Sequence, residues 1–472
     1  MPAGGQLKRE IGLYSAIAIV VSNMVGTGIF TTSGYILETV GNTSTLLLGW
    51  TVGGVFALCG ALCYGELGAR YPQAGGEYVY LREAYGKPVA FLSGWISLIV
   101  GFSAPIAAGA IAFSTYLLRA FGIRYDIYPI FSVFGVPLFS LSLPVFLAIA
   151  VVVLLSILHA HSLHIGSRVQ NLLTLFKVVL VVGFICAGYF ASQRSVGAVS
   201  QTFSFDVKVL DGNFAVALIY ISFAYSGWNA AAYLGGEIKK PSRNIPMAML
   251  IGTVAVTSLY LLLNFVYLLA LPPEEMAGVM EVAAAAGVRL FGPEISRWVN
   301  GAISLGLLSV ISAMIMAGPR VYYAMARDGI FFPSFGNVSD TRHTPIHAIG
   351  LQAAIAIIMM VSASYDKLLV YIGFTLSLFA ILTVIGLMRV RCQSPGNASE
   401  YRTWGYPVTP LVFLLGNLWI VIFSVKSRSA PAIWGLLTIC TGLGMYVCFS
   451  HFFRKASKNL GNAAHAKKED SA

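Results

Sequence analysis

The sequence predicts an all-α integral membrane protein with twelve transmembrane helices. Hydrophobic residues make up 57% of the 472 residues and charged residues only 10%, whereas soluble domains carry about 25% charged residues. The mean hydropathy is +0.78. Charge-poor tracts of 20 residues or so recur along the chain, and each is long enough to cross a bilayer as a helix. The short segments of alternating polarity that are typical of membrane strands do not occur in it.

The apolar tracts follow one another between charged residues, and their number gives the predicted helix count. A stretch rich in proline and aromatic residues, from Tyr128 to Ser142, predicts a loop before the fourth tract. The twelve tracts cover approximately residues 10–38, 38–66, 87–119, 142–162, 168–191, 211–237, 243–274, 297–327, 345–364, 368–388, 407–425 and 432–452.

Basic residues are distributed unevenly between the connecting loops. With both termini in the cytoplasm, 20 of the 30 Lys and Arg residues lie in inside segments and 9 in outside loops. This asymmetry follows the positive-inside rule, so we expect a multi-pass protein of the cell membrane with cytoplasmic N and C termini. The formal net charge of +11 then reflects topology and anionic lipid, and no nucleic-acid partner is expected.

Two predicted helices are interrupted near their middle. The interruptions, Gly26–Gly28 in the first helix and Tyr225–Gly227 in the sixth, lie 199 residues apart. This offset corresponds to five membrane spans, and an odd number of spans would place a second copy of the repeat in the inverted orientation. We therefore expect two inverted five-helix repeats. Broken helices at matching positions of such repeats indicate a transporter binding site. The expected organisation is an N-terminal segment 1–10, a first repeat 11–191, a second repeat 212–391, two further helices 407–453 and a cytoplasmic tail 454–472.

A broken helix exposes backbone groups that a substrate can use. The N–H end of one half attracts a carboxylate, and the C=O end of the other half attracts an ammonium. An α-amino acid carries both groups on adjacent atoms, which makes it the expected ligand. The alternative is that these glycines only allow close packing between helices.

Lys177 is a charged residue within the fifth predicted helix. It lies nine residues after Arg168, or about 14 Å deep at ~1.5 Å per residue. An ammonium at that depth is costly and indicates a function. Its expected partners are carbonyls freed at the first break and hydroxyls of the eighth helix, such as Ser309 or Ser312. It could act as a fixed cation, titrate and couple proton movement, or extend to the membrane interface.

Several other polar residues lie near the predicted helix ends, where contact with solvent or the membrane interface is the simplest interpretation. His159, His161 and His164 are expected at a solvated helix end rather than in a metal site, and no cofactor is expected. Glu66 and Glu237 end their helices on the inside, where either an ion pair or a solvated helix end is possible. A further stretch of mixed aromatic and charged residues is expected to lie along the inner membrane interface, namely Arg70 to Lys87.

Four separated motifs resemble the amino acid–polyamine–organocation (APC) superfamily, and in particular the prokaryotic, stand-alone type of the L-type amino acid transporter branch. They lie in Val25–Phe30, Tyr64–Leu81, Phe223–Pro246 and Gly318–Gly329. The resemblance covers the first ten helices by motif and the last two by count. It implies helices 1–5 and 6–10 as inverted repeats in a bundle-plus-scaffold fold, and secondary transport of α-amino acids by alternating access.

The resemblance also implies roles for individual residues. Phe223 resembles an aromatic gate, and Asn229 matches a position that steadies the unwound segment. Lys177 resembles a family lysine that replaces a sodium ion. The substrate carboxylate would meet backbone N–H groups of Gly26, Thr27 and Gly28, with the Thr27 hydroxyl, and the ammonium would meet carbonyls near Met24, Phe223 and Ser226.

The departures from the family refine the expected function. Because Arg119 to Ser142 contains no cysteine, we expect no disulfide-linked heavy subunit. Predicted helices 1, 3, 6, 8 and 10 show no acid at pocket depth, so neutral amino acids are the expected substrates. The resemblance of Lys177 to the family lysine that replaces sodium implies transport without sodium. The predicted helices carry no His-x-x-x-His pair with a nearby acid, so the protein is not expected to be an enzyme. The alternatives are a proton-coupled permease for cationic amino acids or polyamines and, in another class, a transporter-like amino-acid sensor.

Overall fold

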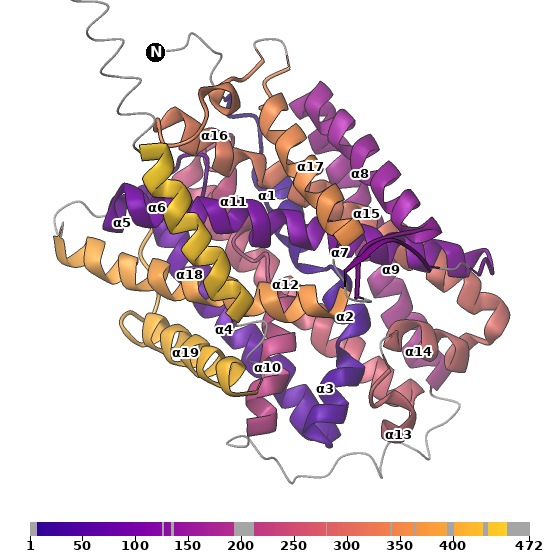
Figure 1. Cartoon of the computed structure of the whole chain (residues 1–472). Coiled ribbons are helices and arrows are strands. Elements are labelled where there is room, and N and C mark those ends of the chain that lie inside the picture. The colour runs from indigo at the N-terminus through magenta and orange to yellow at the C-terminus, as the bar shows by residue number, and fades with distance from the viewer. Residues whose placement is uncertain are drawn as a thin grey trace, which may run out of the picture.

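Helices form almost all of the described chain in this computed structural model (Figure 1). Among the described residues, strands occur only in one antiparallel hairpin, β1 (Ile127–Val133) and β2 (Val136–Ser142). The structure describes residues 7–124, 127–133, 136–192, 212–279, 281–339, 342–362, 365–393, 401–427 and 433–450.

The first five predicted spans coincide with helices. The first span is divided into three helices, and the third contains a π-helical segment, η1, of the kind often found at functional sites. The bounds are α1 Leu13–Met24, α2 Thr27–Thr31, α3 Ser33–Val40, α4 Thr43–Arg70, α5 Glu77–Tyr85, α6 Lys87–Ile96, η1 Ser97–Ser103, α7 Ala104–Ala120, α8 Leu143–His161 and α9 Leu163–Ser192.

The second half begins with another divided span. Its bounds are α10 Gly212–Tyr225, α11 Ala230–Tyr233, α12 Pro241–Ala270, α13 Pro273–Met276, α14 Val282–Phe291, α15 Pro293–Ala317, α16 Pro319–Arg327, the 3-10 helix η4 Pro333–Gly336, α17 Ile346–Ser362, α18 Tyr365–Gln393 and α19 Val408–Ser427, followed by a last helix, Ile433–Ser450.

Within the part of the chain that the structure describes, ten helical segments are long and apolar enough to cross a membrane, judged by length and composition. The sixth and ninth predicted spans coincide with the shorter apolar helices α10 and α17. The helical membrane fold is therefore confirmed. The count of twelve crossings and the division into inverted repeats stay predictions.

The loop expected from Tyr128 to Ser142 is instead the β1–β2 hairpin. Its register runs from the pair Ile127–Ser142 to the pair Val133–Val136, with irregularities on either side of Phe131. The expectation was wrong because the β-branched and aromatic residues of this stretch favour extended backbone, while its prolines are tolerated at strand edges and irregularities.

Local signals explain why α3 and α4 are separate helices. Gly41 ends α3 in a left-handed conformation with φ of 66°, which glycine adopts without strain. Asn42 then starts α4, because its side-chain oxygen accepts hydrogen bonds from the N–H groups of Ser44 and Thr45 at 2.8 and 3.1 Å. These two contacts satisfy backbone donors that the first helical turn leaves free.

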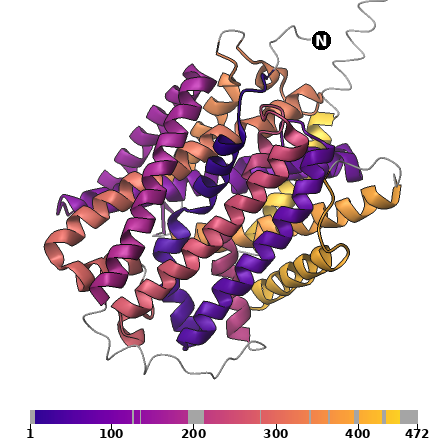
Figure 2. The ribbon, with the colours of Figure 1, turned by 180° about the vertical axis from the view of Figure 1, so that it is seen from behind.

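The helices pack as two groups with the broken helix between them. In the first group α12 packs against α1 and α4, α10 packs against α4, and α4 and α12 run side by side (Figure 2). In the second group α15 packs against α7, α8 and α9, and α17 against α7 and α8. Because α1 also contacts α9 and α15, it joins the two groups. The rings of Trp50, Tyr225 and Tyr260 meet within the first group.

Candidate functional site

The first helix breaks where the sequence predicts, to within a residue. α1 ends at Met24 and α2 begins at Thr27. Between them Gly26 is extended, with φ of −113° and ψ of −152°. Thr27 and Gly28 therefore form the first turn of α2, where backbone N–H groups have no acceptor within the helix.

The second break lies directly against the first. α10 ends at Tyr225 and α11 begins at Ala230. Gly227 has φ of 99°, and a Cβ atom at this position would lie 2.8 Å from the Cβ of Asn23. Glycine is thus required twice here, for the backbone conformation and for the close approach of the two broken helices.

The two breaks line a common pocket, which we term the cradle pocket. It holds about 350 Å³ of space free of protein atoms, its mouth included. Six of the seven predicted substrate-binding residues line it, which confirms that the two motifs come together. These residues are Met24, Gly26, Thr27, Gly28, Phe223 and Ser226, and the remaining lining residues are Asn23, Pro105, Gly109, Ala224, Val310 and Met314.

The carbonyls expected to bind an ammonium differ in availability. The Met24 oxygen accepts hydrogen bonds from the Tyr260 hydroxyl at 2.5 Å and from the Gly26 N–H at 2.8 Å, and these two donors match its two lone pairs. The Phe223 oxygen accepts a hydrogen bond from the Ser226 N–H at 3.0 Å, which leaves one lone pair. The geometry therefore favours Phe223 over Met24 as an acceptor.

Tyr260 was not identified from the sequence. Its hydroxyl contacts the Met24 carbonyl and also lies 2.9 Å from the Ala224 carbonyl, so one side chain of α12 holds the ends of both broken helices. The chain contains 23 tyrosines, and only the three-dimensional position of this hydroxyl distinguishes Tyr260 from the others.

A second, larger pocket, the adjoining pocket, continues from the cradle pocket. The two share Asn23, Pro105, Ser226 and Met314. The adjoining pocket holds about 970 Å³ of space free of protein atoms, its mouth included, which is at the upper end of small-molecule sites. Its other lining residues are Gly53, Phe56, Ala57, Glu77, Gly101, Phe102, Ser222, Tyr225, Gly227, Trp228, Asn229, Ala230, Tyr233, Gly373, Leu376, Ser377, Ala380, Phe413 and Asn417.

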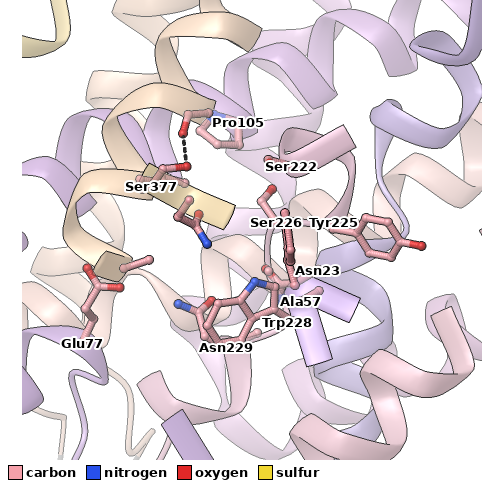
Figure 3. Close-up of a pocket in the computed structure, with 18 of the residues that line it drawn as sticks. Asn23, Ala57, Glu77, Pro105, Ser222, Tyr225, Ser226, Trp228, Asn229 and Ser377 are labelled. Atoms are coloured by element: carbon pink, nitrogen blue, oxygen red, sulfur yellow. Dashed lines mark hydrogen bonds between the residues drawn. The ribbon is translucent and has the colours of Figure 1, made fainter. Parts of the chain in front are cut away.

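Asn229, the seventh predicted residue, belongs to the adjoining pocket (Figure 3). Its amide donates a hydrogen bond to the Tyr233 hydroxyl at 3.4 Å, which links the break to the short helix α11. The Tyr225 ring points away from the pocket (Figure 3) and its hydroxyl donates to the Trp50 carbonyl at 2.9 Å. Side chains on both sides of the break are therefore tied to neighbouring backbone or helix.

Lys177 is buried beneath the first break, with 1% of its surface exposed. Its ammonium donates to the carbonyls of Ser22 at 2.9 Å and Val25 at 2.6 Å. This confirms carbonyls of the first break as partners and excludes extension to the interface. Ser309 lies one step further away, because its backbone carbonyl accepts a hydrogen bond from the Ser22 hydroxyl.

Two expectations about neighbouring polar residues are wrong. His159 is 4% exposed and hydrogen-bonds the Ser312 hydroxyl at 2.8 Å. His159 is therefore not solvated, whereas His161 and His164 are exposed. Because the Ser312 hydroxyl hydrogen-bonds His159, Ser312 is not the partner of Lys177 that the sequence suggested. The last turn of α8 packs against α15, and this contact removes His159 from solvent.

Both glutamates for which an ion pair was an open alternative form one. Glu66 binds Arg391 of α18 through both carboxylate oxygens and also accepts from the Thr403 N–H at 2.7 Å. Glu237 binds Arg320 of α16 at 2.9 and 3.1 Å. Each of these bidentate contacts joins segments that are far apart in the sequence. They therefore fix the relative positions of the segments and also neutralise both buried charges.

The stretch from Arg70 to Lys87 is not a surface element along its length. Its helix α5 begins at Glu77, and residues 77–81 are buried. The interface expectation is therefore wrong for this turn, whose residues face the protein interior. As a result, Glu77 lines the adjoining pocket (Figure 3), where sequence reasoning placed no acid.

Comparison with known proteins agrees with this geometry. Residues 11–446 match the amino acid permease family. The chain is 30% identical to the mouse "Large neutral amino acids transporter small subunit 2", covering 96% of this chain and 85% of that protein. It is 29% identical to the Bacillus subtilis "Serine/threonine exchanger SteT", covering 93% and 96%. It is 30% identical to the mouse "b(0,+)-type amino acid transporter 1", covering 94% and 89%.

These matches extend over nearly the whole chain and include both broken helices. The resemblance to the APC superfamily is thereby confirmed, and the protein is a membrane transporter rather than an enzyme. The chain belongs to the amino acid permease family.

Proposed function

We propose that this protein is a sodium-independent exchanger of neutral α-amino acids that works by alternating access. The observation that carries the proposal is the cradle pocket, where the first turn of α2 and the end of α10 meet. Backbone N–H groups from one broken helix and C=O groups from the other, around one small pocket, suit the carboxylate and ammonium of a zwitterion. The names of the mouse and Bacillus relatives support neutral substrates and exchange.

Lys177 supports independence from sodium. Its ammonium lies against the carbonyls of Ser22 and Val25, which are the kind of ligands that a sodium ion would use. It connects α9 of the second helix group to α1 of the first, and we infer that its ammonium acts as a fixed positive charge at the contact between them.

We further propose a cell-membrane location with both termini in the cytoplasm and a carrier that needs no heavy subunit. The distribution of Lys and Arg supports the orientation. The stretch from Arg119 to Ser142 has no cysteine that could link a helper protein, and the Bacillus exchanger is a relative of matching length.

The proposal is tested with purified protein in proteoliposomes loaded with an unlabelled neutral amino acid. We expect uptake of labelled neutral amino acids that requires internal amino acid and is unchanged when sodium is replaced by choline. Amino-acid amides and esters should not be carried, because they lack the carboxylate. Uptake that requires sodium, or equal transport of the amides, would contradict the proposal.

Phe223 is expected to close over the bound substrate. Its side chain is 8% exposed, lines the cradle pocket and packs in the same apolar cluster as Val100 and Ile372. Phe223→Ala should lower turnover at least about tenfold and change equilibrium binding by less than about threefold, because a missing lid impairs occlusion more than zwitterion contacts. Turnover and substrate-induced thermal stabilisation measure the two effects. Weakened binding at normal turnover would make Phe223 a pocket wall only.

A further inference from the structure

Glu77 is a buried carboxyl group beside the proposed substrate site. It is 7% exposed and lines the adjoining pocket, lying at one edge of the group of side chains in Figure 3, with Asn23 and Ser226 toward the other. Since the adjoining pocket shares lining residues with the cradle pocket, a side chain leaving the cradle can extend toward Glu77.

The carboxyl group lacks the partner that comparable acids have. Glu66 and Glu237 are also buried, and each binds an arginine through both oxygens. None of the ion pairs between described residues includes Glu77. One of its oxygens accepts a hydrogen bond from the Tyr64 hydroxyl at 2.7 Å. A buried carboxylate without a neighbouring cation is costly. A ligand with a positive charge would supply the missing counter-charge, and this pairing would favour its binding.

The walls near Glu77 also suit a cation. Phe102, Trp228, Tyr233 and Phe413 line the same pocket. Aromatic faces attract ammonium and guanidinium groups, most strongly where water is excluded. A long aliphatic chain between the cradle and Glu77 would pack against these rings, and its charged end would meet the carboxylate.

We propose that the adjoining pocket binds the side chain of a long cationic amino acid, such as ornithine or lysine, with Glu77 as the counter-charge. This inference rests on the proposed binding of the zwitterion in the cradle pocket. It extends the substrate range beyond neutral amino acids, for which no counter-charge is needed.

Ornithine and norleucine form a matched pair for the test, because they differ by an ammonium in place of a methyl group. In wild-type protein at pH 8, ornithine should compete with labelled neutral amino acid at least about tenfold better than norleucine. Glu77→Gln should reduce this ratio to below about twofold, since the amide keeps an acceptor for Tyr64 but has no charge. Glu83→Gln, on the exposed side of the same helix and paired with Arg82, is the control and should leave the ratio unchanged.

The ratio should also depend on pH. Burial raises the pKa of Glu77 to about 7, against the opposing effect of the Tyr64 and Ser93 hydroxyls. The carboxylate is thus present above pH 7 and lost below it, falling from about nine-tenths ionised at pH 8 to about one-tenth at pH 6. Ornithine competition should weaken about tenfold over this range. The titratable neighbours, Tyr64, Tyr80 and Tyr233, are phenols and stay neutral here.

A binding measurement separates this inference from the proposed function. Thermal stabilisation of purified protein by ornithine and norleucine reports affinity without transport, and should show the same ratio and the same loss in Glu77→Gln. Absence of neutral amino-acid uptake would overturn the proposed function alone. Equal effects of ornithine and norleucine on wild-type protein, or an ornithine preference that survives Glu77→Gln, would overturn the role of Glu77.

Discussion

Replacing Lys177 with methionine should nearly abolish transport while the protein still inserts and folds. Methionine keeps most of the aliphatic volume and removes the ammonium that binds the Ser22 and Val25 carbonyls. Hydrogen bonds from a charged donor contribute roughly 1.5–3 kcal/mol each. Losing two should reduce turnover at least about a hundredfold, because roughly 1.4 kcal/mol corresponds to tenfold and the contact joins the two helix groups.

Arg168→Met is the matched control, since Arg168 lies on the same helix and is exposed. It should transport normally. Initial exchange rates in proteoliposomes of equal protein content measure both variants, with gel filtration to show intact folding. Normal turnover in Lys177→Met would mean that the ammonium only satisfies local carbonyls. A variant that gains sodium-stimulated uptake would instead strengthen the view that Lys177 occupies a sodium position.

The membrane fold was predictable because hydropathy and charge distribution act on long segments. A bilayer requires about 20 apolar residues per helix, so the apolar tracts could be bounded mainly from the positions of charged residues. The hairpin β1–β2 was not predictable in the same way, because Pro129 and Pro137 are typical of loops while the neighbouring Val, Ile and Phe residues favour strands. Hydrophobic periodicity does not predict whether a short connecting segment folds back and forms a hairpin.

Those parts of the candidate site that consist of backbone at the two helix breaks were predictable from the sequence. Glycines that interrupt a helix are visible in a sequence, and both breaks were located. Side chains that extend into the site from other helices could not be predicted from the sequence. Tyr260 comes from an uninterrupted helix, and Glu77 from a connecting helix whose composition indicates a membrane surface. The same limitation applies to His159, whose burial depends on contact with α15.

The sequence also could not separate two roles that a glycine can have at a break. A Cβ atom at Gly28 would lie 2.6 Å from the Ala224 Cα, so this glycine is needed for close packing of α2 against α10. A Cβ atom at Gly26 would have its closest neighbour, a methyl group of Val310, at 3.6 Å, which is an ordinary contact. Close packing, the alternative interpretation of the motif, therefore holds for Gly28 but not for Gly26.

Gly26→Ala should accordingly weaken substrate binding without destabilising the fold. The added methyl group has room and no strained backbone to adopt, but Gly26 lines the cradle pocket, where the methyl group would occupy space needed by the substrate carboxylate. We expect at least about tenfold weaker binding with an unchanged melting temperature. Substrate-induced thermal stabilisation measures the affinity, and the melting temperature without substrate measures the fold.

Gly28→Ala should show the opposite pattern, since its methyl group meets the backbone of α10. Overpacking of this kind costs about 1–3 kcal/mol, so the melting temperature without substrate should fall. Residual binding by the folded fraction should be less affected than in Gly26→Ala. If Gly26→Ala binds and carries neutral amino acids normally, the carboxylate does not rest on the first turn of α2, and the cradle pocket is not where the zwitterion binds.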